Sequence, residues 1–289
     1  MFVNTIINGV VVGSLYALIA LGPSLVYGLL RVLDIANAAS LVLGAYIGLT
    51  VYRVAHSLPL GLLAAVLVSA AFGLILQRYL YNPLLKRGPL ISLIAGIGVF
   101  MAMGEVFRLV FGPYPLTFPA SVGLPTVHLA GATITGVQIL ILIVGVVVLT
   151  GTWFVLRHTR LGLAWRATSQ DRETASAMGT NTAFVVAAIF AIGYGLAGVA
   201  GVLLGIHYNS VMPMMGAIPA YKMLAIIVLG GLGSPLGTIG AAMLIGLTET
   251  FVVSYAGFVF PREAIAFVLL IAVLLVRPQG LLPTEAMEQ

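Results

Sequence analysis

The sequence predicts an all-α, polytopic integral membrane protein with eight or nine transmembrane helices, some of them short or broken. Hydrophobic residues make up 61% of the 289 residues and charged residues only 7%, whereas a soluble domain carries about a quarter charged residues. Several apolar runs are long enough to cross a membrane as helices, which takes about 20 residues. Short alternating segments, as a membrane barrel would need, are absent. We therefore expect one transmembrane domain over residues 1–289, without disulfides because the chain has no cysteine.

The hydrophobic runs follow one another along the whole chain, and each is expected to form a span. The seventh and ninth are short for a span, so a protein with eight spans would need one re-entrant segment. The runs lie at 4–30, 39–53, 59–80, 89–110, 135–156, 182–205, 220–232, 236–255 and 264–276.

The distribution of Lys and Arg predicts the orientation of these spans. Basic residues gather at 81–88, at 157–181 and after the last span, whereas the long 112–134 segment has no charge. The positive-inside rule places the basic segments in the cytoplasm and 112–134 outside. The segments 206–219 and 256–262 and the N-terminus then lie outside, and the C-terminus inside. Arg53, and Arg262 at the end of the 256–262 segment, are basic residues on the outer side.

Two interruptions of the apolar pattern are expected to have structural consequences. Gly22-Pro23 should break the first span, because proline removes a backbone donor, and Asp34 and Asn37 follow it. Polar side chains at this depth are costly without a role, so we expect a pathway function there. The second interruption, 229–237, is rich in glycine and contains Pro235. Paired breaks are typical of transporter pathways, but here a tight turn between packed helices is favoured.

Charged residues inside the spans need partners or a function. Glu105 and Arg108 are three residues apart and can neutralise each other on one helix face. Glu249 and Lys222 have no obvious local partner, so Glu249 is a candidate for the pathway, while Lys222 could extend to an interface. Glycines spaced by four recur in the spans, and we expect them to serve internal packing rather than a dimer interface. These pairs are Gly9/Gly13, Gly44/Gly48, Gly201/Gly205 and Gly233/Gly237.

No enzymatic signature is present, so we expect no catalytic residue, no metal site and no cofactor bound by this chain. The four histidines are far apart and have no ligand spacing such as HExxH. The Gly230–Gly233 segment lacks the Lys-Ser/Thr pair that would contact phosphate and magnesium in a phosphate-binding loop. If the protein pumps its substrate, another subunit must hydrolyse the ATP.

The 157–181 segment holds six of the 21 charged residues, that is of 13 basic and 8 acidic ones. Arg166, Gln170 and Glu173 would form one polar stripe on a helix, and Trp165 offers one large apolar anchor. Such a short amphipathic helix is suited to docking into a groove of a partner. A solvated connector at the membrane surface explains the pattern equally well, because tryptophan favours that interface.

Five motifs in order carry a family resemblance over about 280 residues. They are NG at 8–9 with GSLYALIALG at 13–22; YG at 27–28 with RVL at 31–33 and LGAY at 43–46; RLG at 160–162 with RA at 166–167, QD at 170–171 and MGTN at 178–181; LGGLGS at 229–234; and RPQGL at 277–281. With them the chain resembles the membrane-spanning permease of bacterial ATP-binding-cassette importers for branched-chain amino acids, the first of their two permeases.

The resemblance implies a subunit of the bacterial inner membrane with a periplasmic N-terminus, a cytoplasmic C-terminus and no ATPase activity of its own. Its implied partners are a second related permease, two ATPase subunits that bind ATP and Mg, and a periplasmic substrate-binding protein; nucleic acid is not among them. ATP would drive alternating access through a cytoplasmic loop that docks on an ATPase. The resemblance assigns this coupling role to Trp165, Arg166, Gln170, Asp171, Arg172 and Glu173.

The chain departs from the family pattern where the pathway is expected. Family members usually carry Asn at the position of Asp34, His or Gln at Asn37, and Gly at Ala38, and Pro23 replaces a more ordinary residue. With Asp34, Asn37 and Glu249 as pathway candidates, these departures leave the substrate open. Related permeases handle urea, short amides or other amino acids.

Two functions of other classes also fit the composition. An ion-coupled secondary transporter would need buried titratable residues, for which Asp34, Glu105 and Glu249 are candidates. A scaffold or receptor without transport is the other alternative. The partner permease is either a homologue or a second copy of this chain.

Overall fold

A computed structural model of the protein describes residues 2–119, 126–129, 132–255 and 261–282. Within these residues, seven helices are long and apolar enough to cross a membrane, and two shorter apolar helices accompany them. The strands in this part of the chain form a small hairpin, in which β1 (Val127–Leu129) pairs antiparallel with β2 (Ala132–Ile134). The protein is a multi-pass, helical membrane protein, as its composition predicts.

The apolar helices match the predicted hydrophobic runs in order, and the seventh and ninth are indeed the two short ones. They are α1 (Phe2–Leu30), α2 (Asn37–Ala55), α3 (Leu58–Leu76), α5 (Pro89–Phe111), α6 (Gly136–His158), α9 (Thr182–His207), α10 (Ala217–Gly230), α11 (Pro235–Tyr255) and α12 (Arg262–Val276). After α3 the chain continues through a π-helical turn, η1 (Gln77–Tyr81), the short α4 (Asn82–Leu84) and a 3-10 turn, η2 (Leu85–Arg87).

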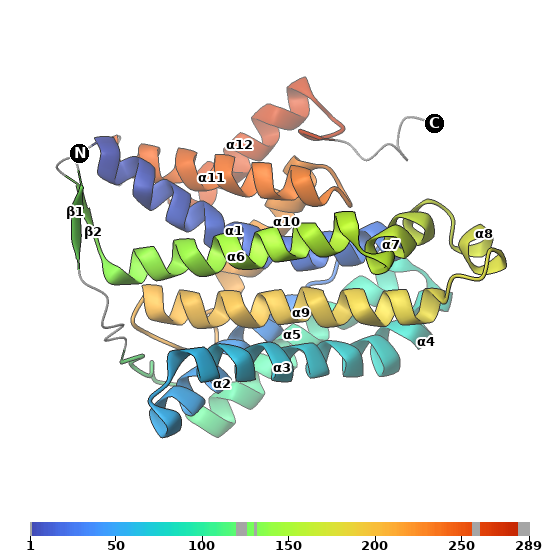
Figure 1. Cartoon of the computed structure of the whole chain (residues 1–289), viewed down its shortest axis with the longest axis horizontal. Coiled ribbons are helices and arrows are strands. Elements are labelled where there is room, and N and C mark those ends of the chain that lie inside the picture. Colours follow the sequence, from blue (N-terminus) through green and yellow to red (C-terminus); the bar gives the residue numbers. More distant parts are fainter. Residues whose placement is uncertain (1, 120–125, 130–131, 256–260, 283–289) are drawn as a thin grey trace.

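The connections between helices gather at two opposite ends of the molecule (Figure 1). The N-terminus and the β1–β2 hairpin mark one end, which we call the hairpin end. There Leu116 and Val211 join the segments after α5 and α9 through backbone hydrogen bonds. The helices α7 (Arg160–Gln170) and α8 (Arg172–Ala177) mark the other end, which we call the α8 end.

This grouping of segments agrees with the predicted alternation of the chain across a membrane. The N-terminal part and the described residues of 112–134 and 206–219, all expected on the outer side, lie at the hairpin end. The basic segments around 81–88 and 157–181, expected in the cytoplasm, lie at the α8 end. Residues 120–125 and 130–131 of the predicted outer loop, 256–260 of the 256–262 loop, and the last residues, 283–289, lie outside the described residues.

The predicted break at Gly22-Pro23 is wrong, because α1 runs unbroken through Pro23. Gly22 instead permits a close helix crossing: a Cβ atom there would lie 2.4 Å from the carbonyl oxygen of Gly193 on α9. The chain leaves the helical conformation only at residues 31–36, where Arg31 has a φ of 54°. Asp34 therefore belongs to a non-helical link between α1 and α2, and Asn37 is the first residue of α2.

The tight turn predicted at the second interruption, 229–237, is confirmed. Residues 231–234 connect α10 to α11, and Gly231 and Gly233 have φ angles of 101° and 81°. These values lie in the region that favours glycine. The two helices meet closely beyond the turn, since a Cβ at Gly237 would lie 2.0 Å from the oxygen of Gly230.

The glycines spaced by four serve internal packing, as expected. A Cβ at Gly44 of α2 would lie 2.4 Å from Cα of Gly198 on α9, and one at Gly13 of α1 would lie 2.9 Å from the sulfur of Met243 on α11. Such positions allow helix backbones to approach closely in lipid. They bring α1 against α11 and α9, and α2 against α9 and α3.

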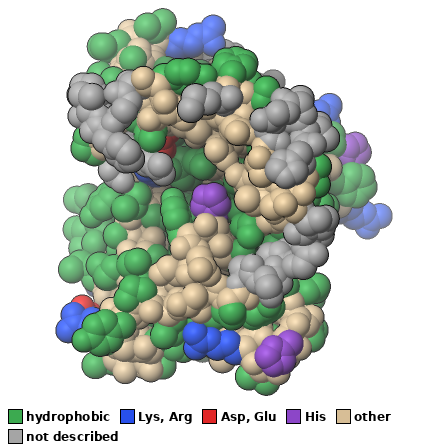
Figure 2. All heavy atoms as spheres, turned by 90° about the vertical axis from the view of Figure 1, so that its left-hand side faces the viewer, with side chains coloured by type: hydrophobic (Ala, Val, Ile, Leu, Met, Phe, Trp, Pro, Cys, Tyr) green, Lys and Arg blue, Asp and Glu red, His purple; other side chains and the backbone are tan. Residues whose placement is uncertain are grey.

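Burial differs sharply between the helices. In the most apolar stretch of α1, 89% of the residues are buried, against 22% in each of the spans that contain α3, α5 and α6. α1 is therefore the central helix, and the other three carry the apolar outer faces. Figure 2 shows hydrophobic side chains over much of the surface at the hairpin end, with a hollow near its centre. The Glu105–Arg108 pair on α5 forms as predicted, with 3.5 Å between the charged atoms.

Candidate substrate pathway and coupling helices

Three buried polar side chains from different helices meet in the interior near the hairpin end. Nζ of Lys222 on α10 donates to both carboxylate oxygens of Glu249 on α11, at 2.7 and 2.9 Å. It also donates to the hydroxyl of Tyr16 on α1, at 2.6 Å, and that hydroxyl donates to Glu249 at 2.9 Å. Lys222 and Glu249 are each 3% exposed. We call this group the Lys222 triad.

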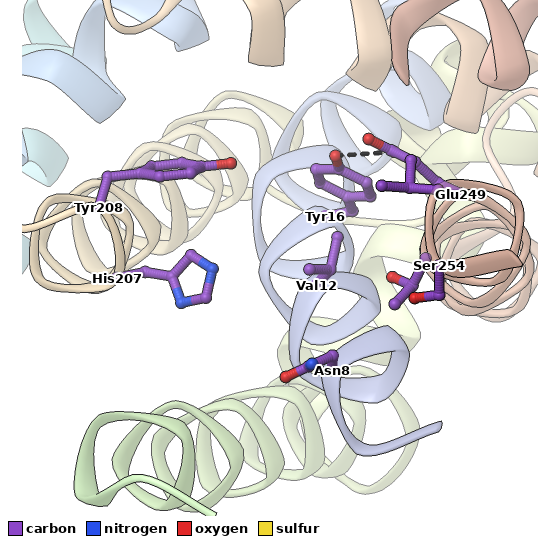
Figure 3. Close-up of a pocket in the computed structure, with 9 residues that line it drawn as sticks. Asn8, Val12, Tyr16, His207, Tyr208, Glu249 and Ser254 are labelled. Carbon is purple, nitrogen blue, oxygen red and sulfur yellow. Dashed lines mark hydrogen bonds between the residues drawn. The ribbon is translucent and has the colours of Figure 1, made fainter. Parts of the chain in front are cut away.

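The packing of small residues brings the triad together. Gly13 and Gly246 let the backbones of α1 and α11 touch, since a Cβ at Gly246 would lie 2.5 Å from Cα of Gly13. Tyr16 follows Gly13 by about one turn and therefore reaches Glu249. Figure 3 shows the Tyr16 and Glu249 side chains pointing toward each other from these two helices.

The sequence missed the partners of Glu249. Local spacing shows none, because Lys222 is 27 residues away and Tyr16 is 233 residues away. The available signal was the opposite sign of Glu249 and Lys222 on consecutive spans, because charges inside membrane segments usually pair with one another. Lys222 does not extend to an interface but remains in the interior.

Two cavities border the Lys222 triad. The first, of about 290 Å³, is lined by residues near the hairpin ends of α1, α9 and α11. They are Asn8, Val12, Tyr16, His207, Tyr208, Glu249, Thr250, Val253 and Ser254. The second, of about 230 Å³, is lined by Tyr16, Lys222, Glu249 and an apolar, methionine-rich wall. Tyr16, Glu249 and Tyr208 line both cavities, so the triad lies between them.

The predicted pathway residues Asp34 and Asn37 lie elsewhere. Asp34, fully buried in the 31–36 link, accepts a hydrogen bond from the Tyr81 hydroxyl. Asn37 donates through Nδ2 to the carbonyl oxygen of Gly193, at 3.3 Å. Neither residue lines the two cavities at Glu249. The structure thus divides the three predicted residues between the Lys222 triad and a second polar cluster between α1, α2, η1 and α9.

This second cluster fixes a polar link inside the apolar interior. Tyr81 packs its ring against Phe190, with 5.3 Å between centroids, and Phe190 stacks on Tyr194 at 5.8 Å. The Ser40 hydroxyl donates to the carbonyl oxygen of Tyr194. Hydrogen bonds donated by Tyr81, Asn37 and Ser40 thus join the 31–36 link, α2, η1 and α9.

The 157–181 segment forms two helices rather than the single helix implied by its polar stripe. Asp171 ends α7 in an extended conformation and caps α8, because its carboxylate accepts hydrogen bonds from the backbone N–H groups of Glu173 and Thr174. The Thr174 hydroxyl also donates to this carboxylate and lowers the pKa of Asp171, which is exposed. Asp and Ser/Thr are favoured where helices begin for this reason.

Five of the six predicted coupling residues are exposed at the α8 end. They are Arg166, Gln170, Asp171, Arg172 and Glu173. Met178, after α8, is 84% exposed and adds an apolar contact surface. Arg166 also has a structural contact, since its Nη1 donates to the carbonyl oxygen of Leu156 near the end of α6, at 2.6 Å.

Trp165 is not a surface anchor, contrary to expectation. Its side chain is 7% exposed, and its Nε1 donates to the carbonyl oxygen of Leu25 on α1 at 3.3 Å. A Cβ at Gly28 would lie 3.0 Å from its ring. The apolar face of α7 turns inward because α1 offers it an apolar surface that solvent does not. Trp165 therefore joins α7 to the central helix.

Comparisons with known proteins identify the family. The family model described as branched-chain amino acid transport system / permease component matches residues 5–276. The chain is 33% identical to the high-affinity branched-chain amino acid transport system permease protein BraD of Pseudomonas aeruginosa, over 100% of this chain and 98% of BraD. It is 31% identical to the corresponding LivH protein of Escherichia coli K12, over 100% and 97% of the two chains.

A more distant relative extends the similarity to another organism. The probable branched-chain amino acid transport permease protein LivH of Methanocaldococcus jannaschii is 26% identical, over 95% of this chain and 90% of its own. No solved structure matches the chain. The full-length coverage and the family model together show that the chain belongs to the family of branched-chain amino acid transport permease components.

Proposed function

We propose that this protein is the membrane-spanning permease of an ATP-driven importer that carries branched-chain amino acids across the bacterial inner membrane. The observation that carries the proposal is the match to a transport permease family over 5–276, with relatives of nearly equal length that are named for this substrate class. The chain itself supplies the path, and separate ATPase subunits supply the energy.

The α8 end is the proposed docking surface for an ATPase. The exposed residues Gln170, Arg172 and Glu173 offer polar contacts, and Met178 offers an apolar one. An open cleft of about 850 Å³ beside α8 is lined by Arg172 together with Gln77, Asn82, Pro83, Leu85, Arg87 and Ala183. Basic and apolar groups around a concave surface are suited to a protein partner with acidic and apolar side chains.

The proposed coupling runs from α7 to the central helix. An ATPase that moves α8 also moves α7, and α7 is joined to α1 by Trp165. α1 in turn carries Tyr16 of the Lys222 triad. A rigid helix that packs against α7 near its C-terminal end and carries Tyr16 near its middle is a physical route for coupling two sites.

The hairpin end is proposed to face the periplasm and the substrate-binding protein. Basic residues concentrate at the α8 end, which the positive-inside rule places in the cytoplasm. Since the chain has no cysteine, a single introduced cysteine reports its own side of the membrane. A membrane-impermeant maleimide should label Tyr114→Cys in intact spheroplasts, but Met178→Cys only after permeabilisation. These side chains are 79% and 84% exposed, so the opposite labelling pattern would reverse the orientation.

Substrate class is tested by uptake in cells that lack their own importers for these compounds. The permease is expressed with the second permease, the ATPases and the binding protein of its system, and uptake of labelled leucine, isoleucine, valine and urea is measured. We expect uptake of the three amino acids and none of urea. Uptake of urea in preference to leucine would place the protein among permeases for small amides.

The docking surface is tested by co-purification. Arg172→Glu should reduce the ATPase recovered with the tagged permease at least about tenfold, because a reversed charge at a complementary interface costs more than its removal. Arg53→Glu, at the hairpin end of the molecule, is the matched control and should leave recovery unchanged. Equal recovery with both variants would contradict the assignment of α8 to the ATPase.

A further inference from the structure

The Lys222 triad combines a buried cation, a buried anion and a hydroxyl between two cavities. On the basis of the proposed function, we propose that the Lys222 triad binds the ammonium and carboxylate groups of an α-amino acid during transport. The substrate carboxylate replaces Glu249 at the ammonium of Lys222, the substrate ammonium pairs with the Glu249 carboxylate, and the aliphatic side chain occupies the methionine-rich cavity.

The charges of the triad match those of a zwitterion. A buried charge is strongly destabilising once its partner is removed, so this ion pair can open only for a group that replaces both halves at once. An amino acid carries one carboxylate and one ammonium and leaves neither Lys222 nor Glu249 unpaired. Urea and short amides carry no charges, and they would have to separate the pair without compensating either member. The triad therefore favours amino acids over urea and short amides, two of the substrate classes that the sequence leaves open.

The second cavity supplies the surface for a branched aliphatic side chain. Its wall contains Leu204, Met212, Met214, Met215, Ile218 and Pro219. Methionine side chains are unbranched and polarisable, so they adapt to apolar groups of different shape. A site with this wall accepts leucine, isoleucine and valine without a shape fitted to any one of them.

The first cavity supplies the approach from the hairpin end. Asn8, His207, Tyr208 and Ser254, from the hairpin ends of three helices, line it together with Tyr16 and Glu249 (Figure 3). Tyr208 extends across the view toward Tyr16, and His207 points into the space beside it. A substrate released at this end would meet the carboxylate of Glu249 first, which favours its positively charged ammonium group.

The test uses the complete transporter in proteoliposomes with internal ATP and measures uptake of labelled L-leucine. Glu249→Gln and Lys222→Met each remove one partner and should reduce uptake at least about tenfold. Both variants can also disturb folding, so the exchanged pair Lys222→Glu/Glu249→Lys is the decisive variant. It restores the buried ion pair but reverses its direction relative to the methionine-rich cavity.

We expect the exchanged pair to recover assembly with the partner subunits and ATP hydrolysis, while leucine uptake stays reduced at least about tenfold. Glu105→Gln, which opens the exposed pair on α5, is the matched control and should transport normally. Uptake restored to the wild-type rate by the exchanged pair would show a purely structural ion pair and overturn the proposal. An exchanged pair that fails to assemble, together with Glu249→Gln that assembles and transports normally, would overturn it equally.

The outcomes separate this inference from the proposed function. If the wild-type transporter takes up leucine with ATP and the single variants do so equally well, the binding site is wrong and the importer stands. If the wild-type transporter takes up no branched-chain amino acid, the proposed function itself fails. A second readout is saturation-transfer NMR of L-leucine with the complex without its binding protein, where leucine should give a signal that Glu249→Gln abolishes and leucinamide, lacking the carboxylate, should give none.

Discussion

At the scale of single residues, Asp34 shows how this protein keeps a carboxyl group in its interior. The side chain is 0% exposed and accepts a hydrogen bond from Tyr81. A buried polar group that loses its partner costs the full desolvation penalty, about 1–3 kcal/mol. The Asp34–Tyr81 contact therefore stabilises the non-helical link between α1 and α2.

A double-mutant cycle tests this contact. Tyr81→Phe should lower the free energy of unfolding by about 1–3 kcal/mol in the native background. In the Asp34→Asn background it should cost less, because an uncharged amide is cheaper to leave without one hydrogen bond. Unfolding of the purified protein in mixed micelles by a denaturing detergent measures both values. Equal costs in the two backgrounds would mean that Tyr81 acts through packing alone.

Asp171 makes a prediction about pH. Its pKa lies below the usual value of 3.8 because the ionised carboxylate accepts the Thr174 hydroxyl and the first N–H groups of α8. A carboxyl group whose pKa is depressed in the folded state stabilises the fold fully at pH values above its unfolded-state pKa. This stabilisation is lost as the pH falls through the folded-state pKa. Amides 172–177 should thus stay protected at neutral pH and lose protection in acid. Hydrogen exchange corrected for intrinsic rates checks this, and Asp171→Asn, whose cap does not titrate, should show no such loss.

The sequence identifies single residues that need a partner, but not the partners themselves. Glu249 could be identified as an intramembrane charge with a role, but its hydrogen bonds to Lys222 and Tyr16 depend on the packing of three helices. Trp165 was identified as an anchor, yet its partner is the α1 backbone rather than another protein. A sequence pattern shows that a side chain needs a partner without showing which surface provides it.

At the scale of helices, close glycine contacts determine how the core elements cross. Gly22 and Gly193 touch at the crossing of α1 and α9, where a Cβ at Gly22 would lie 2.4 Å from a backbone oxygen. Gly22→Ala forces these two backbones apart and should destabilise the protein by about 1–3 kcal/mol, as overpacking does in other cores. Gly98→Ala, where nothing lies within 4 Å, is the matched helical control and should be neutral or stabilising. The same detergent titration compares the two variants.

The joint between α7 and α1 is the second element-scale prediction. Trp165→Ala removes a buried aromatic side chain and should cost about 3–5 kcal/mol where the surroundings cannot collapse. Trp165→Phe keeps most of the packing and loses only the hydrogen bond to Leu25. ATP hydrolysis by the assembled transporter should persist in Trp165→Ala if the ATPase still binds, while leucine uptake per ATP falls. Unchanged uptake per ATP would remove Trp165 from the coupling route.

Element boundaries were predictable where composition decides them. The nine hydrophobic runs correspond to helices because each is apolar and flanked by polar or glycine-rich residues. The prediction of a break at Gly22-Pro23 was wrong, because α1 stays helical through Pro23. Gly22 serves instead as the small residue at the close crossing of α1 and α9. The division of α7 from α8 was missed because the i, i+4, i+7 stripe is continuous in sequence, although Asp171 interrupts the helix to cap the next one.

At the scale of the whole molecule, α1 connects the two regions to which we assign function. It contacts α7 near the α8 end through Trp165 and contributes Tyr16 to the Lys222 triad. Around it, α3, α5 and α6 present apolar faces with many exposed large side chains, such as Leu109 and Val147. These faces can contact either lipid or a second permease, since lipid tails are as apolar as the side chains of another helix.

The central claim is that ATP, hydrolysed by partner subunits, drives transport through this chain. The most direct measurement compares leucine uptake into proteoliposomes that contain either the permease alone or the complete set of two permeases, ATPases and binding protein. We expect uptake only with the complete set and internal ATP, and no response to a proton or sodium gradient. Gradient-driven leucine uptake by the permease alone would contradict it and identify an ion-coupled secondary transporter.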